Sequence, residues 1–255
     1  MESENTLSEQ FGYSRQTVRQ ALSVLEQEGL IERRRGSGTY ISSESRRTPR
    51  GNSIAIVTTY ISDYIFPTII RGIEETLTNA GYDLTLNVTN NHVEEEARIL
   101  QSLISRRVDG VIVEGTKTAF PNPNVELYRR LEKMGVPVVF FNSYYRDLPD
   151  SVYVVTDDRK AGLQAVDLLI EKGCRRIGGV FKSDDMQGHG RYAGFSEGLI
   201  HNGCVLGDDN VVWYTTAERS RLFRPDNSDY MFERLRGCDG IAVSYTHLRA
   251  HETGA

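Results

Sequence analysis

The sequence lacks several features that would place the protein in other classes. Its 255 residues include only three cysteines, Cys174, Cys204 and Cys238, and their spacing fits neither a metal site nor a CxxC motif. No run of eighteen apolar residues occurs, and the first residues are acidic and polar. Neither a membrane span nor a signal peptide is therefore expected. We expect a cytoplasmic protein with reduced thiols and no membrane partner.

The motifs of common enzyme classes are missing as well. The sequence contains no GxxxxGK[ST] phosphate loop and no GxSxG nucleophile elbow, and the glycines of 188–194 lack dinucleotide-binding spacing. Two acidic pairs, Asp157-Asp158 and Asp184-Asp185, resemble catalytic carboxylates in composition only, because adjacent residues at a strand end usually point apart. We therefore expect no enzyme activity, no cofactor and no metal. An enzyme is the less favoured alternative.

Charge is distributed unevenly along the chain. The formal net charge is −5, and the hydrophobic and charged fractions of 39% and 25% are ordinary for a globular protein. Residues 1–50 contain eight arginines and seven acidic residues, which gives +1, whereas the remainder carries −6. This asymmetry is expected when only one end of a chain contacts nucleic acid.

The segment Leu7–Ile41 predicts a small DNA-reading head. It indicates a short helix, a turn at Gly12-Tyr13, a longer helix with Ser14 as N-cap, and a glycine-tipped basic hairpin. The apolar face of the longer helix follows i, i+3, i+4 and i+7 spacing: Val18, Ala21, Leu22 and Leu25. Four polar side chains at its start avoid that face and suit a major groove: Arg15, Gln16, Thr17 and Arg19. A helical hairpin with a solvated charged face is the alternative.

The rest of the chain predicts a larger α/β domain. Residues 42–53 are polar, contain Pro49 and Gly51, and indicate a linker. Apolar strand-like runs then alternate with helical patterns, which is typical of parallel sheets covered on both faces. The strands are expected at 54–58, 82–88, 110–113, 136–141, 152–156, 177–181, 211–214 and 240–243. The helices are expected at 69–80, 95–106, 125–134, 161–171, 192–202 and 230–235.

In sheets of this kind, ligands bind beyond the carboxyl ends of the strands. The segments there are 59–64, 89–91, 114–117, 142–144, 157–158 and 182–185, and they carry carboxylates, amides, cations and tyrosines. This inventory suits a neutral polyhydroxylated ligand, because its hydroxyls donate and accept and its C–H face packs on aromatic rings. For any single residue, a loop cap or a surface group is an equally ordinary interpretation. The candidate effector-binding residues are Tyr60, Asp63, Tyr64, Glu114, Asp157, Lys182 and Arg191.

Three phrases in the head resemble the winged helix–turn–helix of the GntR family. They are SRQTVRQAL (14–22), EGLI (28–31) and GSGTYI (36–41), in that family's order. The resemblance implies operator DNA as a partner. It implies DNA-contacting positions at Glu4, Arg15, Gln16, Thr17, Arg19 and Arg35, with Ser14, Gly36 and Gly38 in the same motifs.

The body is similar to the effector domain of LacI-type repressors, a two-lobed fold shared with periplasmic sugar-binding proteins. The similarity rests on residues 58–74, DGVIVEGTK (109–117) and FKSDDMQGHGRYAGF (181–195). A GntR-type head on such a body resembles the arabinose-responsive repressors. The resemblance implies L-arabinose as effector, a homodimer released from its operator by the sugar, and Arg191 as a pocket arginine. Another sugar or small polar ligand, a free sugar-binding protein and an enzyme are the alternatives.

The expected organisation follows from these segments. It comprises a small α+β winged helix–turn–helix head (1–42), a linker (43–53), a two-lobed α/β effector domain with parallel sheets (54–245) and an atypical tail (246–255). The LacI-type family continues after IAVSY (241–245) with an Asn-Asp pair, whereas this chain reads THLRAHETGA. We expect a foreign tail, truncation at both ends, an incidental His247/His251 pair, and a 255-residue chain that neither binds L-arabinose nor represses.

Overall fold

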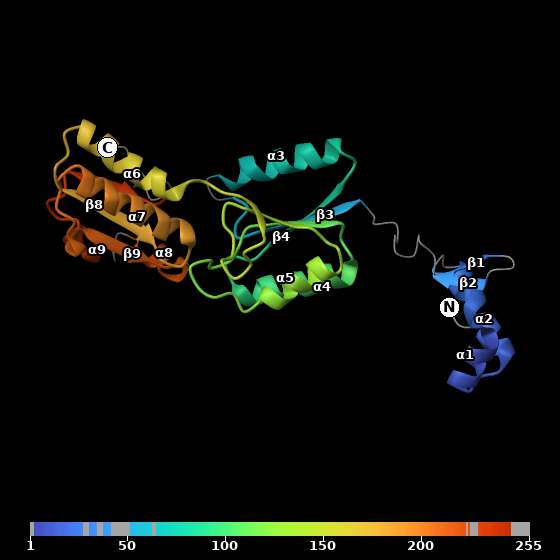
Figure 1. Cartoon of the computed structure of the whole chain (residues 1–255). Helices are drawn as coiled ribbons and strands as arrows, with labels where there is room; N and C mark the ends of the chain where they lie inside the picture. The colour runs from blue at the N-terminus through green and yellow to red at the C-terminus, as the bar shows by residue number, and fades with distance from the viewer. Residues whose placement is uncertain are drawn as a thin grey trace. The chain divides into compact units, whose positions relative to one another are not determined.

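A computed structural model describes residues 3–27, 31–34, 38–41, 52–62, 65–222, 224 and 229–245. The chain divides into two compact units, Met1–Asn52 and Ser53–Ala255 (Figure 1). The predicted linker lies mostly outside the described residues, as do the predicted tail and its two histidines. No helix in the described part of the chain is both long and apolar enough to span a bilayer.

The N-terminal unit is a helix–turn–helix followed by a hairpin. Its helices are α1 (Glu4–Phe11) and α2 (Arg15–Gln27), and its strands, β1 (Ile31–Arg34) and β2 (Gly38–Ile41), pair antiparallel. Gly12 ends α1 in the left-handed region at φ 70°, which glycine adopts without strain. The Ser14 hydroxyl accepts the Thr17 N–H at 3.2 Å and caps α2, as the sequence predicts. The buried core of this unit is small and consists of Val18, Leu22 and Ile31, with Leu7 and Leu25 packed against it.

Lobe 1 of the second unit is built on a five-stranded parallel sheet in the order β4-β3-β5-β6-β7. Its strands are β3 (Ser53–Thr58), β4 (Asp83–Val88), β5 (Gly110–Val113), β6 (Val138–Phe141) and β7 (Val152–Val154). Helix α3 (Phe66–Asn79) covers one face, where Phe66 packs near Ile56. Helices α4 (Val93–Arg106) and α5 (Val125–Lys133) cover the other face through Leu100 and Leu131 (Figure 1).

Lobe 2 is built on a three-stranded parallel sheet in the order β10-β8-β9. Its strands are β8 (Ile177–Lys182), β9 (Val211–Tyr214) and β10 (Gly240–Val243), with a 3-10 turn, η1 (Asp208–Asn210), before β9. Helices α6 (Asp158–Glu171) and α7 (Met186–His201) pack on one face through Val166 and Phe195. The short helices α8 (Thr216–Leu222) and α9 (Asp229–Arg234) contribute Leu222 and Met231 to the other face. The two lobes confirm the predicted α/β class with parallel sheets.

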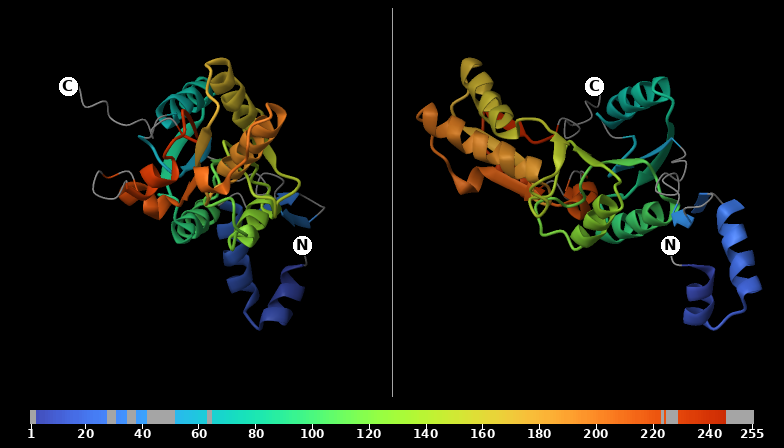
Figure 2. Two further views of the ribbon diagram at one scale, coloured as in Figure 1. Left: turned by 90° about the vertical axis from the view of Figure 1, so that its left-hand side faces the viewer. Right: turned by 45° about the vertical axis from the view of Figure 1, so that its right-hand side comes forward.

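Helices α6 and α7 lie side by side (Figure 2), and their backbones approach each other closely at two glycines. A Cβ atom built on Gly194 would lie within 3.0 Å of the Arg159 carbonyl oxygen. A Cβ atom built on Gly162 would meet the Arg191 carbonyl oxygen equally closely. The two backbones therefore touch, and only glycine fits at these two positions.

Several helix starts and one whole helix differ from the sequence-based expectation, and α3 and α4 begin at Phe66 and Val93 rather than at 69 and 95. Helix α7 begins at Met186 rather than Tyr192, because Asp185 caps it by accepting the Gly188 N–H at 2.7 Å. Helix α6 begins at Asp158 rather than Ala161, with the Asp157 carboxylate capping it at the Lys160 N–H. Helix α8 was not expected, since its seven residues carry no apolar stripe. The start of α7 and helix α8 matter because they contribute Gln187 and Arg219 to the lining of the cleft between the lobes.

Candidate ligand cleft and nucleic-acid interface

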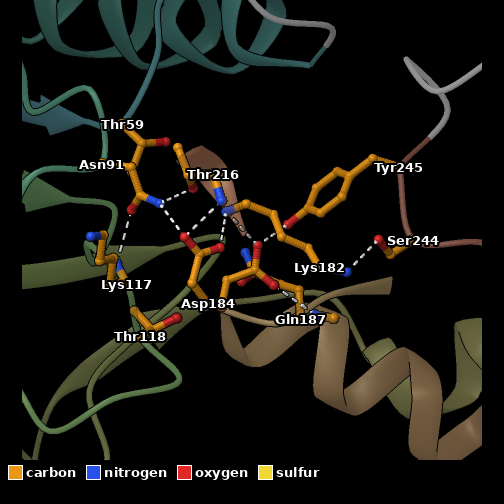
Figure 3. A network of polar contacts seen from close by, with 12 residues as sticks. Thr59, Asn91, Lys117, Thr118, Lys182, Asp184, Gln187, Thr216, Ser244 and Tyr245 are labelled. Atoms are coloured by element: carbon orange, nitrogen blue, oxygen red, sulfur yellow. Dashed lines mark hydrogen bonds and ion pairs between the residues drawn. The ribbon is translucent and has the colours of Figure 1, made fainter. Parts of the chain in front are cut away.

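A cavity of about 580 Å³, its open mouth included, lies where the carboxyl ends of the two sheets meet. Groups from both lobes line it, and Figure 3 shows the polar contacts along its edge. The lining residues are Thr59, Tyr60, Ile65, Phe66, Asn91, Glu114, Gly115, Asn142, Ser143, Lys182, Asp185, Gln187, Arg219 and Tyr245. Three predicted effector-binding residues are among them: Tyr60, Glu114 and Lys182.

Glu114, directly after β5, places a buried carboxyl group in the wall of lobe 1. One carboxylate oxygen accepts the Thr59 backbone N–H at 2.9 Å and the Thr59 hydroxyl, and the other accepts the Asn142 side-chain N–H at 2.6 Å. Burial raises the pKa of this carboxyl, while the hydrogen bonds from Thr59 and Asn142 oppose the rise. These donors fix the carboxyl in one orientation toward the cavity.

Lys182, the last residue of β8, is held between two carboxylates in lobe 2. Its Nζ lies 3.0 Å from an oxygen of Asp184 and 3.0 Å from an oxygen of Asp185. The expectation that adjacent acidic residues point apart is therefore wrong for this pair, because the turn before α7 directs both carboxylates to one cation. Burial favours a higher pKa for Asp184, but Lys182 and the Thr216 N–H outweigh it and lower that pKa.

Gln187, in the first turn of α7, lines the cavity and joins the two lobes. The residue is 4% exposed. Its amide nitrogen donates to the Asn142 carbonyl of lobe 1 at 3.0 Å, whereas its buried amide oxygen has no hydrogen-bond partner among the described residues. An unsatisfied buried acceptor is unfavourable, so this side chain is held across the cleft at a cost.

Two aromatic rings border the cavity on lobe 1. Tyr60 and Phe66 meet edge to face, with ring centroids 6.4 Å apart. Burial raises the pKa of the Tyr60 phenol, so its hydroxyl stays protonated and both donates and accepts. The wall therefore combines apolar ring surface with groups that bind hydroxyls.

The other predicted effector-binding residues lie elsewhere. Arg191 sits behind the wall: it donates to Asp158 at 2.9 Å and to the Ser244 carbonyl, and its guanidinium lies 5.1 Å from the Tyr245 ring centroid. Asp157 caps α6, outside the cavity. Asp63 and Tyr64 lie outside the described residues. Arg191 thus contacts Tyr245 from behind, and Tyr245 itself faces the cavity.

Several lining residues were not selected from the sequence. Asn91, Asn142 and Asp185 belong to the strand-end segments that sequence analysis singled out, so position alone was a usable signal for them. Gln187 comes from the unexpected start of α7, and Arg219 from the unexpected α8. Neither residue could be selected from the sequence, because the first turn of α7 and the whole of α8 were not expected.

The start of α2 carries the predicted DNA-contacting side chains. Arg15, Gln16 and Thr17 are exposed, beside the capping Ser14. Arg19 is exposed too, and its guanidinium forms an ion pair with Glu4 of α1 at 3.0 Å. In the hairpin, Gly38 is exposed and has φ 111°. The predicted Arg35 and Gly36 lie outside the described residues.

Two parallel α/β lobes around a polar cleft, with a separate helix–turn–helix unit, define the class of ligand-binding regulators. Residues 54–199 match the model of the periplasmic binding protein domain, and residues 3–41 match that of bacterial regulatory proteins of the GntR family. The chain belongs to the periplasmic binding protein domain family and carries a GntR-type head.

Two curated relatives match most of this chain. The chain is 40% identical over 223 residues to an arabinose metabolism transcriptional repressor of Halalkalibacterium halodurans, covering 86% of this chain and 59% of the relative. It is 41% identical over 217 residues to the protein of the same name from Geobacillus stearothermophilus, covering 85% and 59%. The chain thus spans about three fifths of the length of these relatives.

Solved structures share the fold. A putative ribose operon repressor from Burkholderia thailandensis matches with a TM-score of 0.65 at 22% identity, covering 78% of this chain and 71% of that one. A LacI-type regulator from Alkaliphilus metalliredigens QYMF, complexed with D-xylulofuranose, matches with a TM-score of 0.59 at 24% identity, covering 75% and 66%. At these identities the likeness is one of fold.

Proposed function

We propose that the protein is a cytoplasmic, dimeric transcriptional repressor of arabinose-utilisation genes, and that L-arabinose releases it from its operator. The exposed arginines and polar side chains at the start of α2 would read the major groove. The cleft would bind the sugar. The names of the two curated relatives support arabinose as the ligand. A non-enzymatic role accords with those names and with the absence of catalytic motifs.

The observation that supports a sugar most directly is a cavity wall of amide, carboxyl and phenol groups from both lobes, among them Gln187, Glu114 and Tyr60. A ring hydroxyl can donate to one such group while accepting from another. Tyr60 and Phe66 supply ring surface for the C–H face of a sugar. Because Gln187 also bonds across the cleft to Asn142, a ligand held there would favour the closed lobes.

Sugar closure and DNA release would be linked as two coupled equilibria. A sugar that binds the closed lobes better than the open ones shifts the population towards closure. If closed subunits place the two heads of a dimer at the wrong separation for two half-sites, operator affinity falls. The reciprocal effect follows: operator DNA lowers sugar affinity by the same factor.

Calorimetric titration of L-arabinose, D-xylose and D-ribose into the 255-residue chain tests the ligand. The described lining residues fall between Thr59 and Tyr245, so we expect saturable binding of L-arabinose, in contrast to the expectation from the sequence alone. Gln187→Met keeps the length of the side chain and removes both the amide oxygen and the donor to Asn142, and it should weaken binding about tenfold or more. Preference for another sugar would reassign the effector, and absence of heat from all three would contradict the ligand class.

Mutations at the start of α2 test the DNA interface. Arg15→Ala or Arg19→Ala should weaken operator binding by about 1–3 kcal/mol if the side chain reads a guanine through two hydrogen bonds. Arg35→Ala should weaken binding to all sequences alike and reduce the salt slope by about one unit if it contacts phosphate. Fluorescence anisotropy across a salt series separates these effects, and equal affinity of all three variants and the parent would disprove the assignment.

A further inference from the structure

Hydrogen bonds join the two lobes directly across the cleft (Figure 3). The Asn91 side-chain nitrogen of lobe 1 donates to the Thr216 hydroxyl of lobe 2 and lies 3.5 Å from an Asp184 oxygen. The Met186 backbone N–H donates to the Thr118 hydroxyl at 3.1 Å. Together with the Gln187–Asn142 bond, these contacts span the opening with the chain's own atoms.

The Asn91 amide is oriented before it reaches lobe 2. Its oxygen accepts the Lys117 backbone N–H at 2.9 Å, so its nitrogen has to point away, toward Thr216. Asn91 is 3% exposed and follows β4 in the left-handed region at φ 58°, which asparagine tolerates better than most residues. Lobe 1 therefore presents a fixed donor.

Thr216 receives this donor at the start of α8. Its backbone N–H donates to Asp184 at 2.9 Å, which fixes the residue on lobe 2. Its hydroxyl accepts from Asn91, so this one residue of lobe 2 is bonded to both lobes. Thr216 is not among the residues that line the cavity.

We propose that Thr216 is a positioning residue that latches the cleft shut by joining Asn91 to lobe 2, and so sets how much effector is needed to close it. The inference deepens the proposed function, because closure is the step that a sugar would drive. The apparent dissociation constant of a ligand equals its intrinsic value divided by the fraction of molecules already competent to bind. A latch that stabilises closure raises this fraction without touching the ligand.

Hydrogen exchange of the full chain without sugar tests the latch. The Met186 amide is protected by Thr118 of the opposite lobe, so its exchange reports opening directly. Thr216→Val keeps the shape of the side chain and removes the hydroxyl, and it should speed exchange at Met186 about threefold to tenfold. Thr216→Ser keeps the hydroxyl and should behave as the parent. Amides of α4 near Leu100, inside the core of lobe 1, should be unchanged in every variant.

A second variant tests the latch by adding a charge rather than by removing the Thr216 hydroxyl. Asn91→Asp places a carboxylate beside Asp184, and repulsion between like charges should open the cleft further than Thr216→Val does. Unchanged exchange at Met186 in both variants, with α4 amides still protected, would overturn the proposal, as would a Thr216→Ser variant that opens like Thr216→Val.

Sugar titrations separate the latch from the proposed function. In Thr216→Val, the dissociation constant for L-arabinose should rise, because the apparent value is the intrinsic one divided by the closed fraction, and faster Met186 exchange reports a larger open fraction. If the parent binds no sugar while Thr216→Val still exchanges faster than the parent at Met186, the proposed effector is refuted and the latch is established. Faster Met186 exchange with an unaltered dissociation constant would overturn the role of Thr216 in setting the effector requirement.

Discussion

Gly194→Ala is expected to disrupt lobe 2, although alanine is ordinarily the better helix former. The added Cβ would approach the Arg159 carbonyl oxygen within 3.0 Å, and backbone atoms cannot rotate away as a side chain can. Helices α6 and α7 would have to separate, which uncovers Val166 and Phe195. We expect a loss of about 3 kcal/mol in the free energy of unfolding, at the upper end of overpacking effects, measured by urea denaturation.

Gly72→Ala is the matched control for this prediction. Gly72 lies within α3, and no atom of the described residues lies within 4 Å of a Cβ built there. The substitution should therefore stabilise the protein by about 0.5–1 kcal/mol, the ordinary helix-interior difference between alanine and glycine. If Gly194→Ala behaves like Gly72→Ala, the two helices are not in backbone contact.

Lys182→Met should destabilise the protein and deform the cleft, because it leaves two carboxylates without their shared cation. The side chains of Asp184 and Asp185 are only 3% and 10% exposed. Removing one partner of a buried ion pair typically costs about 3–5 kcal/mol, and we expect a loss in that range at neutral pH. Lys160→Met removes an exposed lysine and should stay within about 0.5 kcal/mol of the parent.

The effect of Lys182→Met should depend on pH. The pKa of Asp184 is held below its usual 3.8, so its contribution to stability is present above that value and is lost as the pH falls through the folded-state pKa. In the variant, the missing cation lets the Asp184 carboxyl take up a proton at higher pH. The difference between parent and variant should therefore shrink as the pH falls toward 4 and below. An equal loss at all pH values would show that packing, rather than charge, explains the destabilisation.

The sequence predicts the framework well where one physical rule governs a segment. Val18 and Leu22 are buried as their helical spacing predicts, and Ala55 and Val57 are buried as expected of a strand in a covered parallel sheet. The rule that ligands gather at the carboxyl ends of strands places Tyr60, Glu114 and Lys182 correctly on the cavity wall. Local pattern is sufficient for such residues.

Residues whose position depends on contacts between distant segments could not be predicted. Gly188 and Gly190 weaken the helical pattern at the start of α7, so Gln187 was not expected on a helix that faces the cleft. Arg191 does carry a guanidinium near the site, but its bonds to Asp158 and Ser244 turn it behind Tyr245. Partners that lie 33 and 53 positions away along the chain leave no periodic signal.

The ion pair between Arg19 and Glu4 gives the head an internal competitor. Before any nucleic acid arrives, the guanidinium already has an anionic acceptor at 3.0 Å on the neighbouring helix. If Arg19 reads a base as proposed, the base edge has to compete with a carboxylate rather than with water alone. Two well-placed acceptors on a guanine would then displace Glu4, whereas a base that offers one poorly aligned acceptor would leave the ion pair intact.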